Sequence, residues 1–344
     1  MCSGTVARLN DVTAKNGGIH MRYRPFGRTG WNVSEIGFGG WQIGGSWGKV
    51  DDAASVRTLL HAFEAGINFV DTAELYGAGH SETVIGAALR QWHGGKIYVA
   101  TKAQPTVWPD PDDDAPQFRG RFPEWHLRRN VEASLRRLGV ERLDLFQLHS
   151  WGPTGHRELD WLETLNDLRV EGKIDQIGVS LRDNRPQEGV ALAALGLVAS
   201  AQVIFNLFEQ HPGDALLPAA QASGTAIIAR VPLDSGSLIG DWDADSYDRF
   251  EPGSQPHQMF RGDRFAETLR RLAALKADVA PYFAALAEAA MRYVLAHKAV
   301  SVVIPGMKTP EEVDMNIRYS GGGSFPDELL QRLPRHAWIR NFYR

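Results

Sequence analysis

Four side chains of this sequence could together transfer a proton: Asp71, Tyr76, Lys102 and His149. Tyrosine is a weak acid with an ordinary pKa of about 10, but a buried ammonium nearby favours the phenolate and lowers that pKa. Lys102 could supply this ammonium, and Asp71 would keep it charged, because a desolvated lysine otherwise tends to lose its proton. His149 could donate a hydrogen bond to a substrate oxygen and fix its orientation.

Each of these residues, taken alone, also has a purely structural explanation. Asp71 could cap a helix or close a turn, and Lys102 could be its partner at the surface. His149 could be a buried histidine with satisfied hydrogen bonds, and Tyr76 could pack in a loop. The functional interpretation therefore depends on elements that bring all four side chains to one place.

Short apolar runs typical of β-strands alternate along the chain with segments whose apolar residues recur every three or four positions. We expect eight strands, at residues 33–38, 67–70, 97–100, 143–148, 174–179, 201–205, 226–229 and 300–304. We expect eight helices, at residues 53–65, 81–92, 124–138, 158–171, 186–195, 214–222, 284–297 and 311–318. On a chain of 344 residues this alternation predicts an α/β fold, a (β/α)8 TIM barrel, rather than two doubly wound halves.

The barrel interpretation gives the four candidate residues a common location. They follow consecutive strands, the second to the fourth, and active sites of such barrels lie at the carboxyl ends of the strands. Two loops at that end are unusually long: residues 104–122 after the third strand, and residues 238–281 after the seventh, with an extra helical segment near 265–276. Residues 21–31 predict a hairpin that caps the opposite end.

Composition and charge indicate the domain boundaries and disfavour several kinds of binding partner. We expect residues 1–20 to form a flexible N-terminal tail, residues 21–320 the barrel, and residues 321–344 a C-terminal arm beyond a glycine-rich hinge. With 37 basic and 41 acidic side chains, the net charge of −4 gives no general attraction to nucleic acid or to an anionic membrane. One cysteine excludes a disulfide framework, and there is no apolar run of signal-peptide or membrane-spanning length, so we expect a cytoplasmic protein.

Several runs of the sequence also resemble a known family. The runs DTAELYG at 71–77, ATK at 100–102 and DLFQLH at 144–149 are similar to successive motifs of the aldo-keto reductases, as are FGRTG at 26–30 and VSEIG at 33–37. The resemblance extends in order from about residue 21 to residue 316. It implies a (β/α)8 barrel that uses NAD(P)H to reduce carbonyl compounds. Tyr76 would be the general acid, Lys102 and Asp71 would tune it, and His149 would orient the carbonyl group.

The cofactor would be held without the usual dinucleotide fingerprint, because Gln42 stands where the third glycine of a G-x-G-x-x-G motif would be. Lys308, near the start of the last helix, suits a 2′-phosphate and favours NADPH. Glu312 replaces the arginine of many NADPH-specific relatives, so use of NADH stays open. The cofactor contacts implied by the resemblance are Gly40, Trp41, Asp71, Ser180, Gln202, Arg230, Pro232, Leu233, Ser235, Gly236, Leu238, Gly306, Lys308, Glu312 and Asn316.

Three positions at or next to these contacts depart from the family pattern. Leu181 follows Ser180 where relatives frequently have asparagine, which removes one donor to the nicotinamide carboxamide. Arg230 stands where many relatives have an aromatic residue that stacks on the nicotinamide, and its planar guanidinium could take that role. Asp241 replaces a frequent lysine and removes an expected phosphate partner.

The substrate is indicated only in general terms. Trp41, Trp47, Trp108 and Trp151 fall in or near loops at the strand ends, and an aromatic-walled pocket would suit a sugar-like or aromatic carbonyl compound. The direction of the reaction stays open, because the same residues could oxidise an aldose or an alcohol with Tyr76 as the base. The sequence carries no signal for the oligomeric state.

Two other classes of protein are alternatives. A metal-dependent barrel hydrolase is disfavoured, because none of the 11 histidines forms a His-x-His pair, and we expect no metal site. A regulatory subunit that senses redox state, similar to the β subunits of voltage-gated potassium channels, stays open because those relatives keep the same four residues. The intact set of four favours an enzyme that acts on a small-molecule carbonyl substrate.

Overall fold

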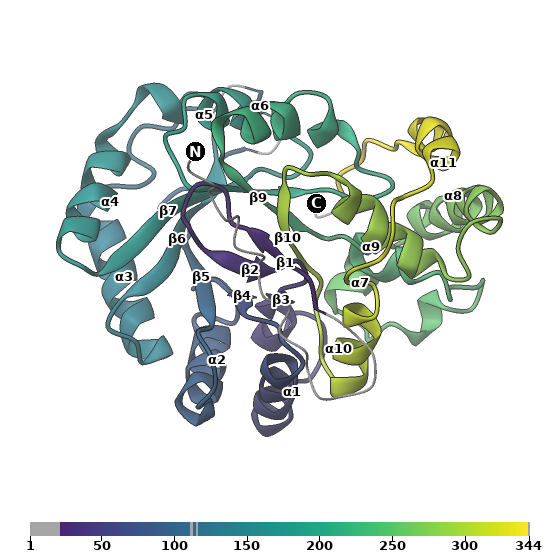
Figure 1. Cartoon of the computed structure of the whole chain (residues 1–344), viewed down its shortest axis with the longest axis horizontal. Helices are drawn as coiled ribbons and strands as arrows, with labels where there is room; N and C mark the ends of the chain where they lie inside the picture. Colours follow the sequence, from purple (N-terminus) through teal and green to yellow (C-terminus); the bar gives the residue numbers. More distant parts are fainter. Residues whose placement is uncertain (1–20, 111–112, 115, 343–344) are drawn as a thin grey trace, which may run out of the picture.

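In the computed structural model, which describes residues 21–110, 113–114 and 116–342, eight parallel strands form a nearly closed barrel (Figure 1). These strands are β3 (Phe38–Gly39), β4 (Phe69–Asp71), β5 (Tyr98–Ala103), β6 (Leu143–Trp151), β7 (Ile174–Leu181), β8 (Ser200–Ile204), β9 (Ala226–Arg230) and β10 (Val300–Ile304). Each pairs with the next in chain order, and isolated parallel bridges link Ile36 to Val303 and Gly39 to Gly306. The predicted (β/α)8 barrel is confirmed, while the predicted tail, residues 1–20, lies outside the described residues.

Helices surround the barrel and return the chain from each strand to the next (Figure 1). They are α1 (Asp52–Glu64), α2 (His80–Gln91), α3 (Glu124–Leu138), α4 (Asp160–Val170), α5 (Val190–Ala194), α6 (Leu216–Ser223), α7 (Gln255–Met259), α8 (Asp263–Val279), α9 (Leu286–Ala296), α10 (Pro310–Ile317) and α11 (Asp327–Arg332). Side chains cap α1 and α10: Asp51 accepts from the Ala54 amide, and Thr309 from the Glu312 amide. None of the described helices is long and apolar enough to span a membrane.

The first predicted strand, residues 33–38, is wrong, because that segment is divided between two structures. Residues Asn32–Ser34 form β2, which pairs antiparallel with β1 (Tyr23–Pro25), whereas Phe38–Gly39 form β3 of the barrel and Ile36 makes a single bridge to β10. The buried carboxylate of Glu35 lies between the two parts. It accepts from Arg24 Nε at 2.7 Å and from Ser320 Oγ at 3.0 Å. An apolar run interrupted by a buried, paired acid thus bends instead of continuing as one strand.

The hairpin formed by β1 and β2 closes the amino-terminal end of the barrel, as predicted. Phe26, fully buried in the hairpin turn, stacks on Trp31 and on Phe69, the first residue of β4. Trp31 in turn stacks on Tyr98, the first residue of β5. These contacts build an apolar layer across the starts of the strands. The polar candidate residues lie at the other end.

The two long loops and the C-terminal segment lie at or near the carboxyl end of the barrel. The loop after β9 contains α7 and α8, and α8 is the extra helix predicted near residues 265–276. The described part of the predicted arm packs against the barrel, with Leu329 and Leu333 fully buried. The Trp338 amide donates to the Phe208 carbonyl at 2.8 Å. The arm is therefore part of the packed structure up to residue 342.

Candidate active site

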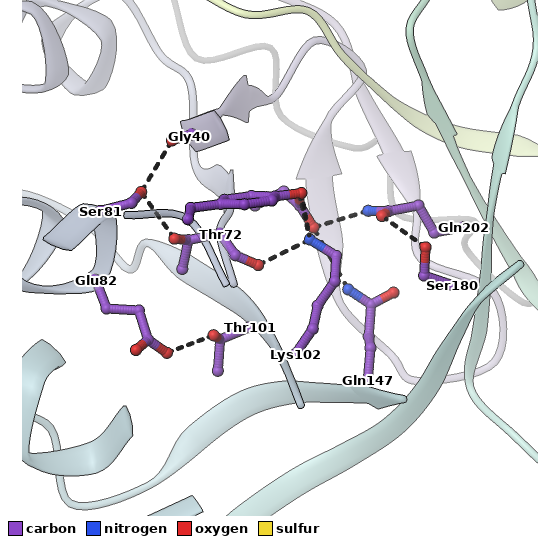
Figure 2. A network of polar contacts seen from close by, with 11 residues as sticks. Gly40, Thr72, Ser81, Glu82, Thr101, Lys102, Gln147, Ser180 and Gln202 are labelled. Atoms are coloured by element: carbon purple, nitrogen blue, oxygen red, sulfur yellow. Dashed lines mark hydrogen bonds and ion pairs between the residues drawn. The ribbon is translucent and has the colours of Figure 1, made fainter. Parts of the chain in front are cut away.

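The structure brings the four candidate residues together at the carboxyl end of the barrel. Lys102 Nζ donates to Asp71 Oδ2 at 2.7 Å, to the Thr72 carbonyl at 2.8 Å and to the Tyr76 hydroxyl at 3.3 Å (Figure 2). The ring of His149 lies edge-on to that of Tyr76, with ring centroids 6.2 Å apart. The Lys102 ammonium is fully buried, whereas Asp71, Tyr76 and His149 line a cavity.

Three neighbouring strands position these groups. Asp71 is the last residue of β4, Lys102 lies on β5 and His149 on β6. The strands are parallel, so their carboxyl ends meet at one face of the barrel. The proximity predicted from the sequence thus follows from topology.

The turn that carries Tyr76 is fastened to the barrel by buried hydroxyl groups. Ser81, in the first turn of α2, donates to the Gly40 carbonyl at 2.9 Å and accepts from the Thr72 hydroxyl at 2.8 Å (Figure 2). Both hydroxyl side chains are fully buried. These bonds hold the base of the turn, and with it the phenol ring, against the end of β4.

Two glutamine amides complete the environment of the Asp71 carboxylate. Gln202 Nε2 donates to Asp71 Oδ1 at 2.7 Å, and Gln147 Nε2 approaches the same oxygen at 3.4 Å. Ser180 donates to Gln202 Oε1 at 3.3 Å (Figure 2). Sequence reasoning assigned Gln202 and Ser180 to the cofactor and missed Gln147. A polar residue inside the apolar run 145–148 was the available signal for Gln147.

The electrostatic state of Tyr76 differs from the sequence expectation. Burial raises the pKa of the Tyr76 hydroxyl above its ordinary value, and the nearby Lys102 ammonium only partly opposes this effect. For Lys102, burial acts to lower the pKa, but Asp71 and Tyr76 outweigh it and raise that pKa above its ordinary value. At neutral pH the pair is therefore a protonated phenol beside a charged ammonium.

His149 is neutral at the same pH. Burial, followed by the charges of Lys102 and Arg230, lowers the pKa of His149 well below its ordinary value. A neutral imidazole keeps one N–H group, which can donate to an uncharged oxygen. Its Nδ1 atom is buried and has no hydrogen-bond partner among the described residues.

A cavity of about 750 Å³ opens above these groups, a volume typical of small-molecule and cofactor sites. The predicted cofactor and pocket residues in its wall are Trp41, Trp47, Asp71, Trp108, Gln202, Arg230, Pro232, Leu233, Ser235, Gly236, Gly306, Glu312 and Asn316. The wall thus runs from the candidate catalytic groups, past the loop after β9, to the first turns of α10. Five predicted residues are not in it: Gly40, Trp151, Ser180, Leu238 and Lys308.

Trp151 is an anchor of the fold and not a wall of the cavity. Its side chain is fully buried and lies 5.3 Å from the ring of Trp161 and 4.9 Å from that of Phe118. The register of β6 against β7 shifts between His149 and Trp151, and Ser150 has a left-handed backbone with φ 73°. This irregularity separates Trp151 from the cavity that His149 lines, and the sequence carries no signal for it.

Lys308 does not line the cavity and is bonded within the chain. Its Nζ donates to the Trp47 carbonyl at 2.7 Å, and its backbone amide donates to the Glu312 carboxylate at 2.6 Å. Glu312 itself lines the cavity. The helix start that was expected to receive a 2′-phosphate therefore holds a carboxylate of the chain.

The other three predicted residues, Gly40, Ser180 and Leu238, lie outside the wall of the cavity. Ser180 is buried and bonded to Gln202, the Gly40 carbonyl accepts from Ser81, and Leu238 is fully buried in the apolar core. Of the three, Ser180 is bonded to a residue that does line the cavity, Gln202.

Arg182, which the sequence analysis missed, also lines the cavity. Its Nε donates to both Glu188 oxygens, at 3.1 and 3.0 Å, and its Nη1 donates to the Asp113 carbonyl at 2.9 Å. This buried pair holds the loop after β5, whose Trp108 ring lies 5.8 Å from His149. The available signal was an arginine directly after a strand-like run.

The residues present fit a nicotinamide dinucleotide. Two buried side-chain oxygens at the cavity wall, Gln42 Oε1 and Asn316 Oδ1, have no partner among the described residues and could accept hydrogen bonds from a ligand. Gly306 lies beside the Gln42 side chain. A Cβ at position 306 would come within 2.7 Å of that side chain, so the glycine leaves room for it at the cavity wall. Arg230 lies at the same wall, where Asp183 and the Leu181 carbonyl hold its guanidinium at 2.6 and 3.2 Å.

Comparison with known proteins defines the class to which this barrel and site belong. The model of the Aldo/keto reductase family matches residues 35–336. An NADH-specific methylglyoxal reductase from Escherichia coli is 27% identical over 86% of this chain and 93% of its own. A D-threo-aldose 1-dehydrogenase from a Pseudomonas species is 29% identical over 84% and 89%. The solved structure of a glycerol dehydrogenase from Gluconobacter oxydans superposes with a TM-score of 0.73 at 28% identity, covering 91% and 94%.

The chain therefore belongs to the aldo-keto reductase family of oxidoreductases. The described residues contain no group of three or more His, Cys, Asp or Glu side chains that could hold a metal ion.

Breaking the buried ion pair should cost more stability than removing both charges. We expect Lys102→Met to lower the free energy of unfolding by about 3–5 kcal/mol, because it leaves the Asp71 carboxylate buried and unpaired. The double variant with Asp71→Asn should recover most of this loss. Chemical denaturation measures both values. The control is Arg249→Met: Arg249 and its partner Asp243 are 61% and 60% exposed, so a change of at most about 1 kcal/mol is expected. Equal stability of the single and double variants would contradict this account.

Proposed function

We propose that this protein reduces an aldehyde or ketone to the alcohol, with Tyr76 as the general acid and a nicotinamide dinucleotide as the hydride donor. The observation that carries the proposal is the Tyr76 hydroxyl at the cavity wall, with the buried Lys102 ammonium 3.3 Å behind it. The bound nicotinamide would supply a hydride to the carbonyl carbon. The carbonyl oxygen then needs one proton to complete the alcohol, and Tyr76 is placed to give it.

The three other polar groups support this proton transfer. After donation, Tyr76 is a phenolate, and the Lys102 ammonium stabilises the negative charge. Asp71 keeps Lys102 charged in a buried position. Neutral His149 would donate its N–H to the substrate oxygen and so orient the carbonyl group. Because the pKa of Tyr76 is raised, the acid form predominates at neutral pH, which favours reduction over oxidation.

The aromatic rings at the cavity wall favour an uncharged carbonyl substrate that is aromatic or sugar-like. Trp41 and Trp47 meet edge to face at 5.4 Å, Trp41 lies 6.3 Å from Tyr76, and Trp108 forms another wall. Flat rings of this kind bind either an aromatic group or the apolar face of a sugar. The relatives named for methylglyoxal and for aldoses also act on small carbonyl or aldose compounds.

The Glu312 carboxylate bears on the choice between NADH and NADPH. NADPH was favoured because Lys308 could pair with a 2′-phosphate, and NADH use stayed open. With Lys308 bonded to Trp47 and a carboxylate at the cavity wall, a 2′-phosphate would meet a like charge. We therefore propose that NADH is accepted at least as well as NADPH. The Escherichia coli relative is likewise named as an NADH-specific enzyme.

Substitution of the proposed acid tests the reaction. Tyr76→Phe should lower kcat for carbonyl reduction by at least about a hundredfold, because general acid catalysis typically contributes that much or more. Quenching of tryptophan fluorescence should show that the variant still binds the cofactor. Retained turnover would exclude Tyr76 as the acid. Cofactor binding without turnover of any carbonyl by the unchanged protein would favour the redox-sensing alternative.

The pH dependence follows from the direction of the Tyr76 shift. Reduction needs protonated Tyr76, so kcat/KM for reduction should stay level between about pH 6 and pH 8 and fall only as pH rises above the ordinary tyrosine range. Oxidation needs the phenolate and should accelerate as pH rises. His149 adds no change in this interval, because its pKa is well below its ordinary value. A reduction rate that falls through neutral pH would contradict this assignment.

Removal of the Glu312 charge tests the cofactor argument. Glu312→Gln should strengthen binding of NADPH relative to NADH by about tenfold, which corresponds to about 1.4 kcal/mol. Fluorescence titration with each cofactor gives the two dissociation constants. Glu311→Gln is the matched control, because Glu311 is exposed and does not line the cavity. An unchanged ratio for Glu312→Gln would show that this carboxylate does not select the cofactor.

A further inference from the structure

The loop after β9, residues 231–239, forms one wall of the cavity in an unfavourable backbone conformation. Leu233, Ser235 and Gly236 line the cavity. The backbone angle φ is 55° at Val231, 48° at Asp234 and 55° at Ser235, all in the left-handed region that side chains with a Cβ rarely adopt. Such conformations persist only where surrounding contacts enforce them. Contacts around the loop therefore hold it, and one of them is the bond from Asn206 Nδ2 to the Val231 carbonyl at 2.9 Å.

The C-terminal arm supplies a contact of this kind. Arg340 Nη2 forms an ion pair with Asp234 Oδ2, and each of the two side chains is only 11% exposed. Asp234 also accepts from the Ser237 hydroxyl at 2.5 Å, within the same loop. The ion pair joins residues 106 positions apart in the chain. It ties the middle of the loop to the last part of the described arm.

Aromatic rings hold Arg340 in position. The guanidinium carbon lies 3.9 Å from the ring centroid of Trp338, 4.9 Å from that of Phe342 and 5.2 Å from that of Phe208. The Trp338 amide is bonded to the Phe208 carbonyl, so the rings are attached to the barrel. A guanidinium stacked in this way loses little further freedom when it pairs.

The residue next to Arg340 reaches the cavity itself. Asn341 lines it together with Ser235 and Gly236. The arm thus contributes to the same wall as the loop that it ties down. Neither contact is with the four catalytic candidates.

We propose that Arg340 is a positioning residue for the cofactor: its ion pair with Asp234 keeps the loop 231–239 closed against the cavity and so slows release of the bound dinucleotide. This inference rests on the proposed function. Opening of a loop is a common way for such ligands to leave, and release of this kind limits turnover in many enzymes. The C-terminal arm would then set the rate of cofactor exchange without touching the reacting atoms.

The same arm offers a matched control. Arg335, with Arg332 and His336, pairs with Asp278 near the end of α8, and none of these four residues lines the cavity. Arg335 is therefore an arm arginine in an ion pair that does not hold the cavity wall. A general loosening of the arm would affect both pairs, whereas the proposed role belongs to Arg340 alone.

The test compares dissociation rates of NADH and of NADPH, measured by stopped-flow fluorescence, in the full chain and its variants. Arg340→Gln should raise the dissociation rate about tenfold and raise KM for the cofactor, with little change in KM for the carbonyl substrate. Arg335→Gln should leave the dissociation rate within about twofold. Arg340→Lys should restore part of the slow release, because it restores the charge but not the stacking.

Asp234→Asn provides a second route to the same result. It should speed release as Arg340→Gln does, and the double variant should show no further increase, because both substitutions break one interaction. An unchanged dissociation rate in folded Arg340→Gln and Asp234→Asn, or an equal increase in Arg335→Gln, would overturn the inference. If the unchanged protein binds neither NADH nor NADPH, the proposed function itself fails, and that result is separate from the other two.

Discussion

The ion pair between Lys102 and Asp71 is the interaction on which the arrangement of the site depends. Removing two charges from water costs several kcal/mol per ion, and attraction between them offsets this only when their remaining hydrogen-bonding groups are also satisfied. The structure meets that condition with the Thr72 carbonyl for the ammonium and the amides of Gln202 and Gln147 for the carboxylate. The carboxyl end of the barrel interior is therefore polar because one buried ammonium must be kept charged.

The same strand that carries Lys102 also fixes the surrounding helices. Side chains alternate along a strand, so the neighbouring Thr101 faces the opposite way. Its hydroxyl donates to Glu82 Oε1 at 2.5 Å (Figure 2). Arg137 Nε donates to Glu82 Oε2 at 2.6 Å. Glu82 lies on α2 and Arg137 on α3, so one buried carboxylate joins β5 to both helices. A shift of β5 would consequently disturb the ammonium on one face and the helix contacts on the other.

The regular parts of the fold could be predicted from the sequence, because strand-like and helix-like segments alternate along it. Alternating strands and helices were enough for the barrel, and the topology then placed Asp71, Lys102 and His149 together. The failures are local departures from regular structure. The bend at buried Glu35 divided the first strand, and the irregularity after His149 removed Trp151 from the cavity. Such features depend on contacts between distant residues, which the order of residue types alone does not show.

The two ends of the barrel differ in the regularity of their backbone and in their polarity. The described residues with positive φ other than glycine are Ala78, Ser150, Asn184, Val231, Asp234 and Ser235, and each lies after or at the carboxyl end of a barrel strand. This conformation is unfavourable above all for the β-branched Val231, and strain of this kind persists where the rest of the structure over-determines it. The layer around Phe26 at the amino-terminal end is apolar and buried, and it contains none of these residues. The buried Lys102–Asp71 pair and the unfavourable backbone conformations therefore gather at the end of the barrel that carries the cavity, whereas apolar packing closes the other end.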